Sequence, residues 1–388
     1  MKSILDKSKI YLHVVESAQH PAHSVYQDVL AHPPVQYMNH EFTKLSSTVN
    51  NKLSFASNIL NTVKLPNVWR IKKNCNLIHS AQYLMLNRTP WVMDFEINAA
   101  LTGFNMNRLN SSTCRFAIKK LIQSKHCKRI LPWSEAAAKS LRTYLSDKKI
   151  AEKITVVHPS FTPEFRIKDL PKKRNTSTTE FLFAGKYFLP KGGKEALAVI
   201  EQLNKSCDVH LTIASDAAPE LQKKYAKNKA ITFLPWMPRK EYFEKHFSQA
   251  DVFFLPTHYD TYGIQFLEAA SLGIPVLATR TFAVPELVLH EKTGLLAQSP
   301  RISWFNKDYQ IAYKNTHQEN WQNYITNLAQ KKEPALEKEL FCFAKKLAEA
   351  TTFRNRLGAN AQKRFNKEFN GRKRNQLLRA VYEEALRR

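Results

Sequence analysis

Long apolar runs, cysteine pairs and glycine are all scarce in this chain of 388 residues. No run of about 18 apolar residues occurs, so we expect no membrane-spanning helix. The start, MKSILDKSKIYLHVVES, has a short apolar patch broken by charge and does not read as a signal peptide. The five cysteines are scattered, odd in number and lack a CxxC spacing, which indicates a reducing compartment and argues against structural zinc. We therefore expect a cytoplasmic protein.

Acidic residues are also few. Thirty-three Asp and Glu stand against 59 Lys and Arg, which gives a formal net charge of +26. The excess peaks in residues 101–150, with roughly eleven basic against two acidic side chains. This balance suggests an anionic partner, although a solvated lysine-rich surface would give the same composition. No RRM, zinc-finger or helix-turn-helix signature is present, so we do not expect nucleic acid as the partner.

What the chain does contain is an alternation of strand-like and helix-like stretches. This predicts an α/β protein with mostly parallel, doubly wound sheets, and the length fits two domains. Residues 165–179 are polar and without periodicity, so we place an interdomain linker there. We expect an N-terminal domain over residues 1–170, a second over 171–370, and a final helix over 371–388 that packs back on the first. The expected strands include Asn76–His79, Trp91–Phe95, Arg129–Pro132, Ile154–Val157, Glu180–Ala184, Val209–Ala214, Ile231–Leu234 and Val252–Leu255.

With nine glycines in the whole chain, each needs a conformational reason. Six fall in the second half at predicted loops. In open α/β sheets, ligands bind beyond the carboxyl ends of the strands, and glycine there lets main-chain N–H groups approach an anion. These six are Gly185, Gly192, Gly193, Gly263, Gly273 and Gly294.

The first of these loops is FLFAGKYFLPKGGKEALAVIEQL. A strand ends at Gly185, and Lys186 and Lys191 precede a helix opened by two glycines. Two ammonium groups in a loop between a strand and a helix would bind a diphosphate and neutralise the charge of a leaving group. A turn with solubilising lysines would have the same sequence. The loop matches neither a P-loop nor a dinucleotide GxGxxG pattern.

The second loop, DVFFLPTHYDTYGIQFLEAASLGIPVLAT, sets Asp260 eight positions before Glu268. We expect Asp260 on the loop and Glu268 about one turn into the following helix. Ionised carboxylates accept hydrogen bonds from sugar hydroxyls, and the first N–H groups of a helix receive phosphate oxygens. An acidic loop with a surface glutamate is the alternative. The N–H groups concerned belong to Tyr262, Gly263, Ile264 and Gln265.

Together these motifs resemble the retaining glycosyltransferases of family 4. Their signature is an acidic residue, seven residues, a glutamate, a small-residue turn and G-x-P-V; here it reads Asp260-TYGIQFL-Glu268, then AASLGIPVLAT. The resemblance also covers the G-K and K-G pairs upstream and the PELV and TGLL segments downstream, and it extends over roughly residues 129–296. It implies the GT-B fold, in which two Rossmann-like domains, an N-terminal one for the acceptor and a C-terminal one for the donor, face each other across a cleft.

Carried over residue by residue, the resemblance implies that Lys186 and Lys191 hold the diphosphate of a nucleotide-sugar donor. Glu268 would take the ribose hydroxyls and Asp260 the transferred sugar. The main-chain amides from Tyr262 to Gln265 would meet sugar and phosphate.

The FLPWM segment matches the nucleobase edge of the family, which makes Trp236 and Met237 candidates beside the base. The family transfers with retention of configuration, usually without a metal, and no DxD stands near these motifs. We therefore expect a nucleotide sugar as co-substrate and no metal or other cofactor. Charge on the leaving group would be stabilised by the lysines and helix N-termini.

Three positions depart from the family pattern. Asp260 stands where glutamate is more frequent, and Lys186 replaces an arginine with the loss of its bidentate geometry. Where the family often has a histidine in the first domain, this chain reads WVMDFE. We hypothesise that Asp94 or Glu96 contacts the sugar or the acceptor; Asp94 as a cap of the next helix is the alternative. His79 matches a strand-end position of the family, but a loop or core role fits it better.

The leading hypothesis is a glycosyltransferase that moves a hexose or N-acetylhexosamine to a lipid-linked or polysaccharide acceptor at the cytoplasmic membrane face. The basic residues of 108–149, interleaved with Phe116, Ile118, Leu121 and Ile122, would seat the first domain on anionic lipid. A soluble small-molecule acceptor is the second hypothesis. A non-catalytic binding protein on the same scaffold is the third. The nucleotide, the sugar, the acceptor and the oligomeric state stay open.

Overall fold

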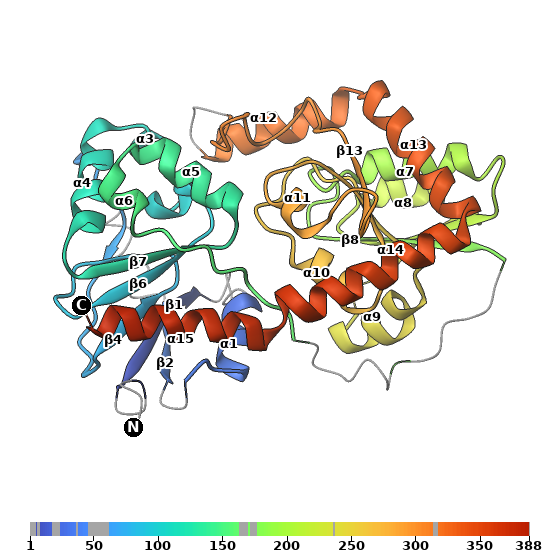
Figure 1. Ribbon diagram of the computed structural model, residues 1–388. Coiled ribbons are helices and arrows are strands. Elements are labelled where there is room, and N and C mark those ends of the chain that lie inside the picture. Colours follow the sequence, from blue (N-terminus) through green and yellow to red (C-terminus); the bar gives the residue numbers. More distant parts are fainter. Residues whose placement is uncertain are drawn as a thin grey trace. The chain divides into compact units, whose positions relative to one another are not determined.

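The computed structural model describes residues 5, 8–17, 24–35, 38–45, 62–162, 170, 177–235, 237–312 and 317–387. The chain divides into two compact units (Figure 1). The first unit comprises Met1–Ser160, Asn306–Asn320 and Asn370–Arg388, and the second unit comprises Phe161–Phe305 and Trp321–Phe369. The linker expected over residues 165–179 lies mostly outside the described residues. The return of 306–320 to the first unit is a feature that the sequence did not indicate.

The first unit is built on a five-stranded parallel sheet of order β2-β1-β4-β6-β7. In chain order this is 2-1-3-4-5, a doubly wound arrangement. Its strands are β1 (Ile10–Ser17), β2 (Met38–Leu45), β4 (Leu77–Ser80), β6 (Trp91–Phe95) and β7 (Cys127–Pro132), with a short pair β3 (Val68–Trp69) and β5 (Leu84–Met85) beside it. Its helices are α1 (Ser24–Ala31), η2 (Asn98–Thr102), α3 (Met106–Leu109), α4 (Ser112–Gln123), α5 (Glu135–Leu145), α6 (Lys148–Ala151) and α15 (Gly371–Arg387).

The C-terminal helix α15 completes the core of this unit, packing against β4 and β7 (Figure 1). Its apolar side follows the helical period that the sequence predicted, and burial of each large side chain contributes about 1.5–3 kcal/mol. The buried cluster that joins the sheet to this helix consists of Leu5, Ile10, Val35, Leu77, Val92, Leu131, Val157, Leu378, Val381, Tyr382 and Ala385.

The second unit contains a six-stranded parallel sheet of order β10-β9-β8-β11-β12-β13, which is 3-2-1-4-5-6 in chain order. The order reverses between β8 and β11, and in such sheets ligands bind beyond the carboxyl ends of the two strands at that point. The strands are β8 (Thr179–Ala184), β9 (Val209–Ala214), β10 (Ile231–Phe233), β11 (Val252–Leu255), β12 (Val276–Thr279) and β13 (Gly294–Ala297).

Helices surround this second sheet, and β11 and β12 are buried along their whole length, as expected for central parallel strands. The edge strand β13 is also buried, because α13 and α14 pack against it. The helix α13 packs against α7, β12 and β13, and α14 packs against α10 and β13. The helices are α7 (Gly193–Leu203), α8 (Pro219–Tyr225), α9 (Arg239–Lys245), η4 (Phe247–Gln249), α10 (Ile264–Ser271), α11 (Val284–Leu287), α12 (His317–Gln330), α13 (Pro334–Glu349), α14 (Thr351–Arg364) and the π-helix η5 (Phe365–Phe369).

Two details differ from the sequence-based expectation. The strand expected at Ile154–Val157 is wrong, because only an isolated bridge between Ile130 and Ile154 forms there. The segment runs beside β7, with the N–H groups of Thr155 and Val157 donating to the carbonyls of Ile130 (3.0 Å) and Pro132 (2.9 Å), but it does not extend the ladder beyond that bridge. The strand β2 (MNHEFTKL) was not expected, since its polar residues conceal the alternation. Among the described residues, no helix is long and apolar enough to cross a membrane.

Candidate functional site

The loops that follow β8 and β11 meet at the point where the order of the second sheet reverses. Gly192 has φ +83°, and a Cβ on it would lie 2.1 Å from the carbonyl oxygen of Pro256. The carbonyl oxygen of Pro190 accepts hydrogen bonds from the N–H groups of His258 (2.8 Å) and Tyr259 (3.1 Å). Only glycine permits this approach, so the two glycine-containing loops predicted from the sequence are joined through their main chains.

Lys191 and Asp260 form an ion pair across these two loops. Lys191 Nζ lies 2.6 Å from Asp260 Oδ2, and the two side chains are 11% and 7% exposed. A Cβ on Gly185 would stand 3.3 Å from Lys191 Cγ, so the aliphatic part of the lysine lies against this glycine. The ammonium is 6.0 Å from the centre of the Tyr259 ring. A lysine has three N–H donors, so this ammonium can hold the aspartate and still donate to an anion.

Helix α10 begins directly after this pair. Its N-cap is Gly263 at φ 92°, and a Cβ there would stand 3.4 Å from Asp260 Oδ2. The N–H groups of Ile264 and Gln265 belong to the first helical turn, where no carbonyl of the same helix can accept them. Such groups attract anions, as does the partial positive charge at a helix N-terminus. The main-chain positions predicted for phosphate therefore lie beside Asp260.

Two predicted residues at this site have a different environment from the one expected. Lys186 is exposed, and its ammonium lies 5.1 Å from the centre of the neighbouring Tyr187 ring. The Tyr262 side chain is 3% exposed, and burial together with the charge of Glu286 raises its pKa well above 10. Tyr262 can therefore offer its main chain to a ligand, while its phenol belongs to the core.

Glu268 is buried on α10 and is paired with a residue that sequence reasoning missed. Arg239 Nη2 lies 2.5 Å from Glu268 Oε1. The guanidinium stands over the rings of Phe243 (4.8 Å) and Phe161 (5.6 Å). Arg239 stands two positions after Met237, the last residue of the segment predicted to meet the nucleobase. A positive charge so close to that segment was the signal that the sequence offered. Of that segment, Met237 is half-buried and Trp236 lies outside the described residues.

In the first unit, Asp94 is the last residue but one of β6, is buried, and lies beside the imidazole of His79. Asp94 Oδ1 lies 3.1 Å from His79 Nε2, and His79 Nδ1 lies 2.6 Å from the hydroxyl of Tyr382 on α15. Burial, and then the charge of Asp94, raise the pKa of Tyr382 well above 10. The phenol is therefore protonated and can donate to His79, whose Nε2–H then faces Asp94. His79 is thus a core residue on β4 with two polar partners.

The alternative role for Asp94, as a helix cap, is wrong. The helix that follows, η2, has Ile97 at its N-cap and no side-chain capping bond. Glu96 is partly exposed, and its Oε2 accepts a hydrogen bond of 3.0 Å from Gln82 Nε2. Both acids lie at the carboxyl end of β6, which is the ligand edge of a parallel sheet. Among the described residues, no group of three or more histidine, cysteine or acidic side chains is arranged to hold a metal ion.

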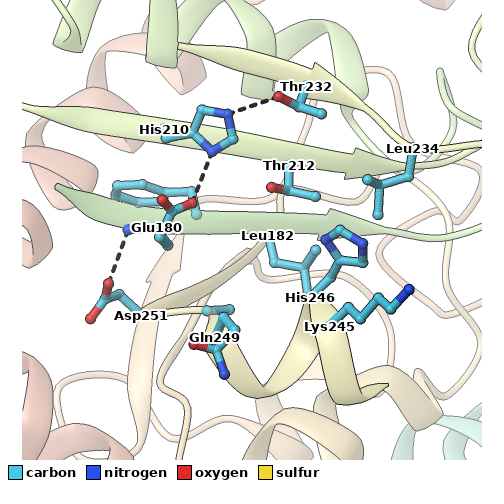
Figure 2. A pocket seen from close by; sticks show the side chains of 12 residues that line it. Glu180, Leu182, His210, Thr212, Thr232, Leu234, Lys245, His246, Gln249 and Asp251 are labelled. Atoms are coloured by element: carbon cyan, nitrogen blue, oxygen red, sulfur yellow. Dashed lines mark hydrogen bonds and ion pairs between the residues drawn. The ribbon is translucent and has the colours of Figure 1, made fainter. Parts of the chain in front are cut away.

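A separate hollow of about 240 Å³ opens on the face of β8, β9 and β10 (Figure 2). Figure 2 shows His210 between Glu180 and Thr232, at 2.8 Å and 2.9 Å. Lys245 and His246, at the end of α9, line the other side. Of the residues predicted for donor binding, none that the structure describes lines this hollow. We therefore assign it no part in the site at the carboxyl ends of the strands.

The sequence similarity to a known protein family lies in the second unit. Residues 178–305 match the family model described as Glycosyl transferases group 1. The D-inositol 3-phosphate glycosyltransferase of Pseudarthrobacter chlorophenolicus is 30% identical over 148 residues, which is 35% of this chain and 35% of that protein. The match thus spans about a third of the length of this curated relative.

Solved structures match over nearly the whole chain. HepE of Anabaena, crystallised with UDP and glucose, has a TM-score of 0.59 at 14% identity and covers 97% of this chain and 99% of its own. WaaG, a glycosyltransferase involved in lipopolysaccharide biosynthesis, has a TM-score of 0.57 at 14% identity, with coverages of 96% and 99%. At these identities the likeness establishes the fold. The GT-B fold and the resemblance to glycosyl transferases group 1 are confirmed, while the narrower assignment to family 4 stays a prediction.

Proposed function

We propose that this chain, with its GT-B fold and its group 1 glycosyltransferase segment, is a retaining glycosyltransferase. It would move a hexose or N-acetylhexosamine from a nucleotide sugar to a lipid-linked or glycan acceptor at the cytoplasmic face of a membrane. The observation that carries this proposal is the Lys191–Asp260 pair beside the start of α10, at the reversal point of the second sheet.

The donor diphosphate would lie between the Lys191 ammonium and the first N–H groups of α10. In the transfer, the bond between the sugar anomeric carbon and the β-phosphate oxygen breaks, and the acceptor hydroxyl oxygen bonds to that carbon on the same face. The hydroxyl proton passes to the departing phosphate. Lys191, Lys186 and the N–H groups of Ile264 and Gln265 would stabilise the charge that develops on the leaving diphosphate.

The carboxylates would orient the rest of the donor. Asp260, held by Lys191, would accept hydrogen bonds from hydroxyls of the transferred sugar, and Glu268 would accept them from the ribose. Arg239 shares the Glu268 carboxylate and so would fix its orientation toward the ribose. Met237 and Trp236 would stand beside the base. Asp94 or Glu96 would serve the sugar or the acceptor from the first unit.

The membrane part of the proposal is supported by α4. Phe116 is 61% exposed on this helix, next to the exposed Arg115, and the Lys120 ammonium lies 5.2 Å from its ring centre. An exposed aromatic among basic side chains suits an anionic lipid surface. The apolar residues expected to share this role are fewer than predicted, because Ile118 and Ile122 are fully buried in the core.

The donor is tested by thermal shift with UDP, GDP and ADP, followed by their sugars and by assays of donor hydrolysis. We expect one nucleotide to raise the melting temperature, since a ligand that binds only the folded state stabilises it. UDP is the first to test, because HepE was crystallised with it. No stabilisation and no turnover with any donor would favour a non-catalytic binding protein.

The acceptor side is tested separately by flotation with anionic liposomes at low salt. Binding that is lost in a Phe116→Ser, Lys120→Ser variant supports the membrane location. Absence of binding by the unaltered protein removes the membrane part of the proposal. Full activity in lipid-free buffer would then indicate a soluble acceptor.

A further inference from the structure

A buried histidine joins the two loops of the donor site to a third segment. His258, in the loop after β11, is 0% exposed. Its main-chain N–H donates to the carbonyl of Pro190 at 2.8 Å. Its ring Nε2 lies 3.3 Å from Oε2 of Glu195, in the first turn of α7, and Nδ1 lies 3.0 Å from the carbonyl oxygen of Ile302. This residue of the segment after β11 therefore contacts the segments after β8 and β13.

A second carboxylate faces the same ring. Glu333 Oε1 lies 3.6 Å from His258 Nδ1, and the Glu333 carboxylate accepts the N–H groups of Arg301 and Ile302, each at 2.8 Å. The side chains of Glu195 and Glu333 are 2% and 5% exposed. Buried carboxylates need a counter-charge or hydrogen bonds, and an imidazolium between them supplies both.

The environment favours the charged form of both His258 and Glu195. Burial would lower the pKa of His258, but the hydrogen bond and charge of Glu195, the carbonyl of Ile302 and the charge of Glu333 outweigh it, so its pKa is raised above 6.5. Burial would raise the pKa of Glu195, but the hydrogen bond and charge of His258 outweigh it, so its pKa is lowered. Between these two pKa values the pair is ionised.

We infer that His258, as an imidazolium, is a positioning residue for the donor site proposed above, on which this inference rests. The imidazolium holds the Asp260 loop against the Lys191 loop. It also neutralises Glu195 at the start of α7, whose negative charge would otherwise repel the donor diphosphate. When His258 is charged, the six ionisable groups of this region carry three positive and three negative charges, so their net charge is zero. When His258 is neutral, their net charge is −1. This count takes the two carboxylates that face the ring, Glu195 and Glu333, together with Lys194 beside Glu195 and the Lys191–Asp260 pair of the two loops.

The direction of the pH effect follows from the two shifts. A raised histidine pKa means that its stabilising contribution is present below the unfolded-state value and is lost as pH rises through the folded-state value. A lowered glutamate pKa means that its contribution is lost as pH falls through the folded-state value. Above the pKa of His258, Glu195 keeps its charge but loses the imidazolium, and the Lys194 ammonium at 3.9 Å is the cation that stays beside it. The loops then loosen and anion binding weakens.

The first test needs no ligand. Hydrogen exchange of residues 185–195 and 256–263, corrected for intrinsic rates, is measured across pH 6 to 9 in the unaltered protein, in His258→Gln and in His210→Gln. His210 is the matched control, because it also pairs with a glutamate in this unit but lines the separate hollow (Figure 2). We expect loop protection to fall with rising pH in the unaltered protein and in His210→Gln, and to be low throughout in His258→Gln.

Identical loop protection in His258→Gln and the unaltered protein at every pH would overturn the inference. If His258→Gln does not fold, Glu195→Gln decides by the same criterion, since it keeps the shape of the side chain and removes only the charge.

The second test uses UDP-glucose, whose two phosphates do not titrate in this range because neither is a terminal group. By calorimetry, we expect the dissociation constant of the unaltered protein to rise about fivefold or more toward alkaline pH, and that of His258→Gln to stay level. The same pH profile in both proteins would overturn the inference. If the loops respond as expected but UDP-glucose binds at no pH, the positioning role stands and the proposed donor fails.

Discussion

Lys191 Nζ lies 2.6 Å from Asp260 Oδ2, and this contact joins two loops that are 69 positions apart in the chain. Lys191 lies in the connection between β8 and α7, and Asp260 lies in the connection between β11 and α10. The strands β8 and β11 stand where the order of the second sheet reverses. The pair neutralises a buried charge on each loop. An ammonium has three N–H donors, so the contact with Asp260 leaves donors for a ligand.

Replacement of Lys191 by methionine should separate stability from binding. The Lys191→Met variant leaves a buried Asp260 carboxylate without its counter-charge, so we expect the free energy of unfolding to fall by about 3–5 kcal/mol. Donor affinity should fall more than about tenfold, which is about 1.4 kcal/mol. Chemical denaturation and calorimetry measure the two effects.

The double variant Lys191→Met, Asp260→Asn is the control. Because both charges are gone, we expect it to recover most of the stability and none of the donor affinity. Recovery of both would show that the ammonium does not bind the donor.

Arg239 should act on donor affinity more than on the chemical step. Removal of the guanidinium in Arg239→Ala frees the Glu268 carboxylate from its fixed orientation, so we expect the donor KM to rise about tenfold with kcat within about twofold. Arg239→Lys keeps the positive charge but loses the planar guanidinium that can donate two parallel hydrogen bonds. We expect its donor KM to lie between those of the unaltered protein and Arg239→Ala. Steady-state kinetics against donor concentration provides the measurement. An unchanged KM in Arg239→Ala would contradict a role beside the ribose.

Gly192 should tolerate no side chain. In Gly192→Ala the new Cβ would lie 2.1 Å from the Pro256 carbonyl oxygen at a φ of +83°, so the two loops must move apart. We expect a loss of about 1–3 kcal/mol in the free energy of unfolding and weaker donor binding by the folded protein.

Gly103→Ala in the first unit is the matched control, since its φ is also positive, at +61°. It should lose stability through strain while donor affinity is unchanged. Equal donor affinity in Gly192→Ala and the unaltered protein would show that the close approach of the loops is not needed for binding.

The two acids of the first unit should matter for transfer and not for nucleotide binding. We expect the Asp94→Ala, Glu96→Ala variant to lose transferase activity more than about hundredfold while the nucleotide dissociation constant changes less than about twofold, as for groups that act on the sugar or acceptor. Transfer assays and calorimetry on the same preparation measure both. Full transferase activity in this variant would rule out a role for either acid.

Much of the candidate site could be predicted from local sequence patterns, because its loops follow strands that are recognisable in the sequence. Gly192 and Gly263 stand at positive φ as the N-caps of α7 and α10, and Asp260 and Glu268 are close in the chain. Pairings between distant segments could not be predicted. Arg239 meets Glu268 only because α9 returns across the sheet.

The same limit applies to the first unit. The sequence left His79 as a loop or core residue, and its partner Tyr382 is 303 positions away on α15. No sequence spacing predicts the contact between His79 and Tyr382, because it depends on the packing of the C-terminal helix against β4. The clamp made by His258 is hidden for the same reason, since its two carboxylates come from α7 and from the residue before α13.

The most direct test is a crystal structure of the protein with the nucleotide selected by the thermal-shift screen. We expect the diphosphate within hydrogen-bond distance of Lys191 Nζ and of the main-chain N–H groups of Ile264 and Gln265, with the ribose hydroxyls on Glu268. A nucleotide found away from these groups, for example in the hollow between β8–β10 and α9, would contradict the proposed donor site.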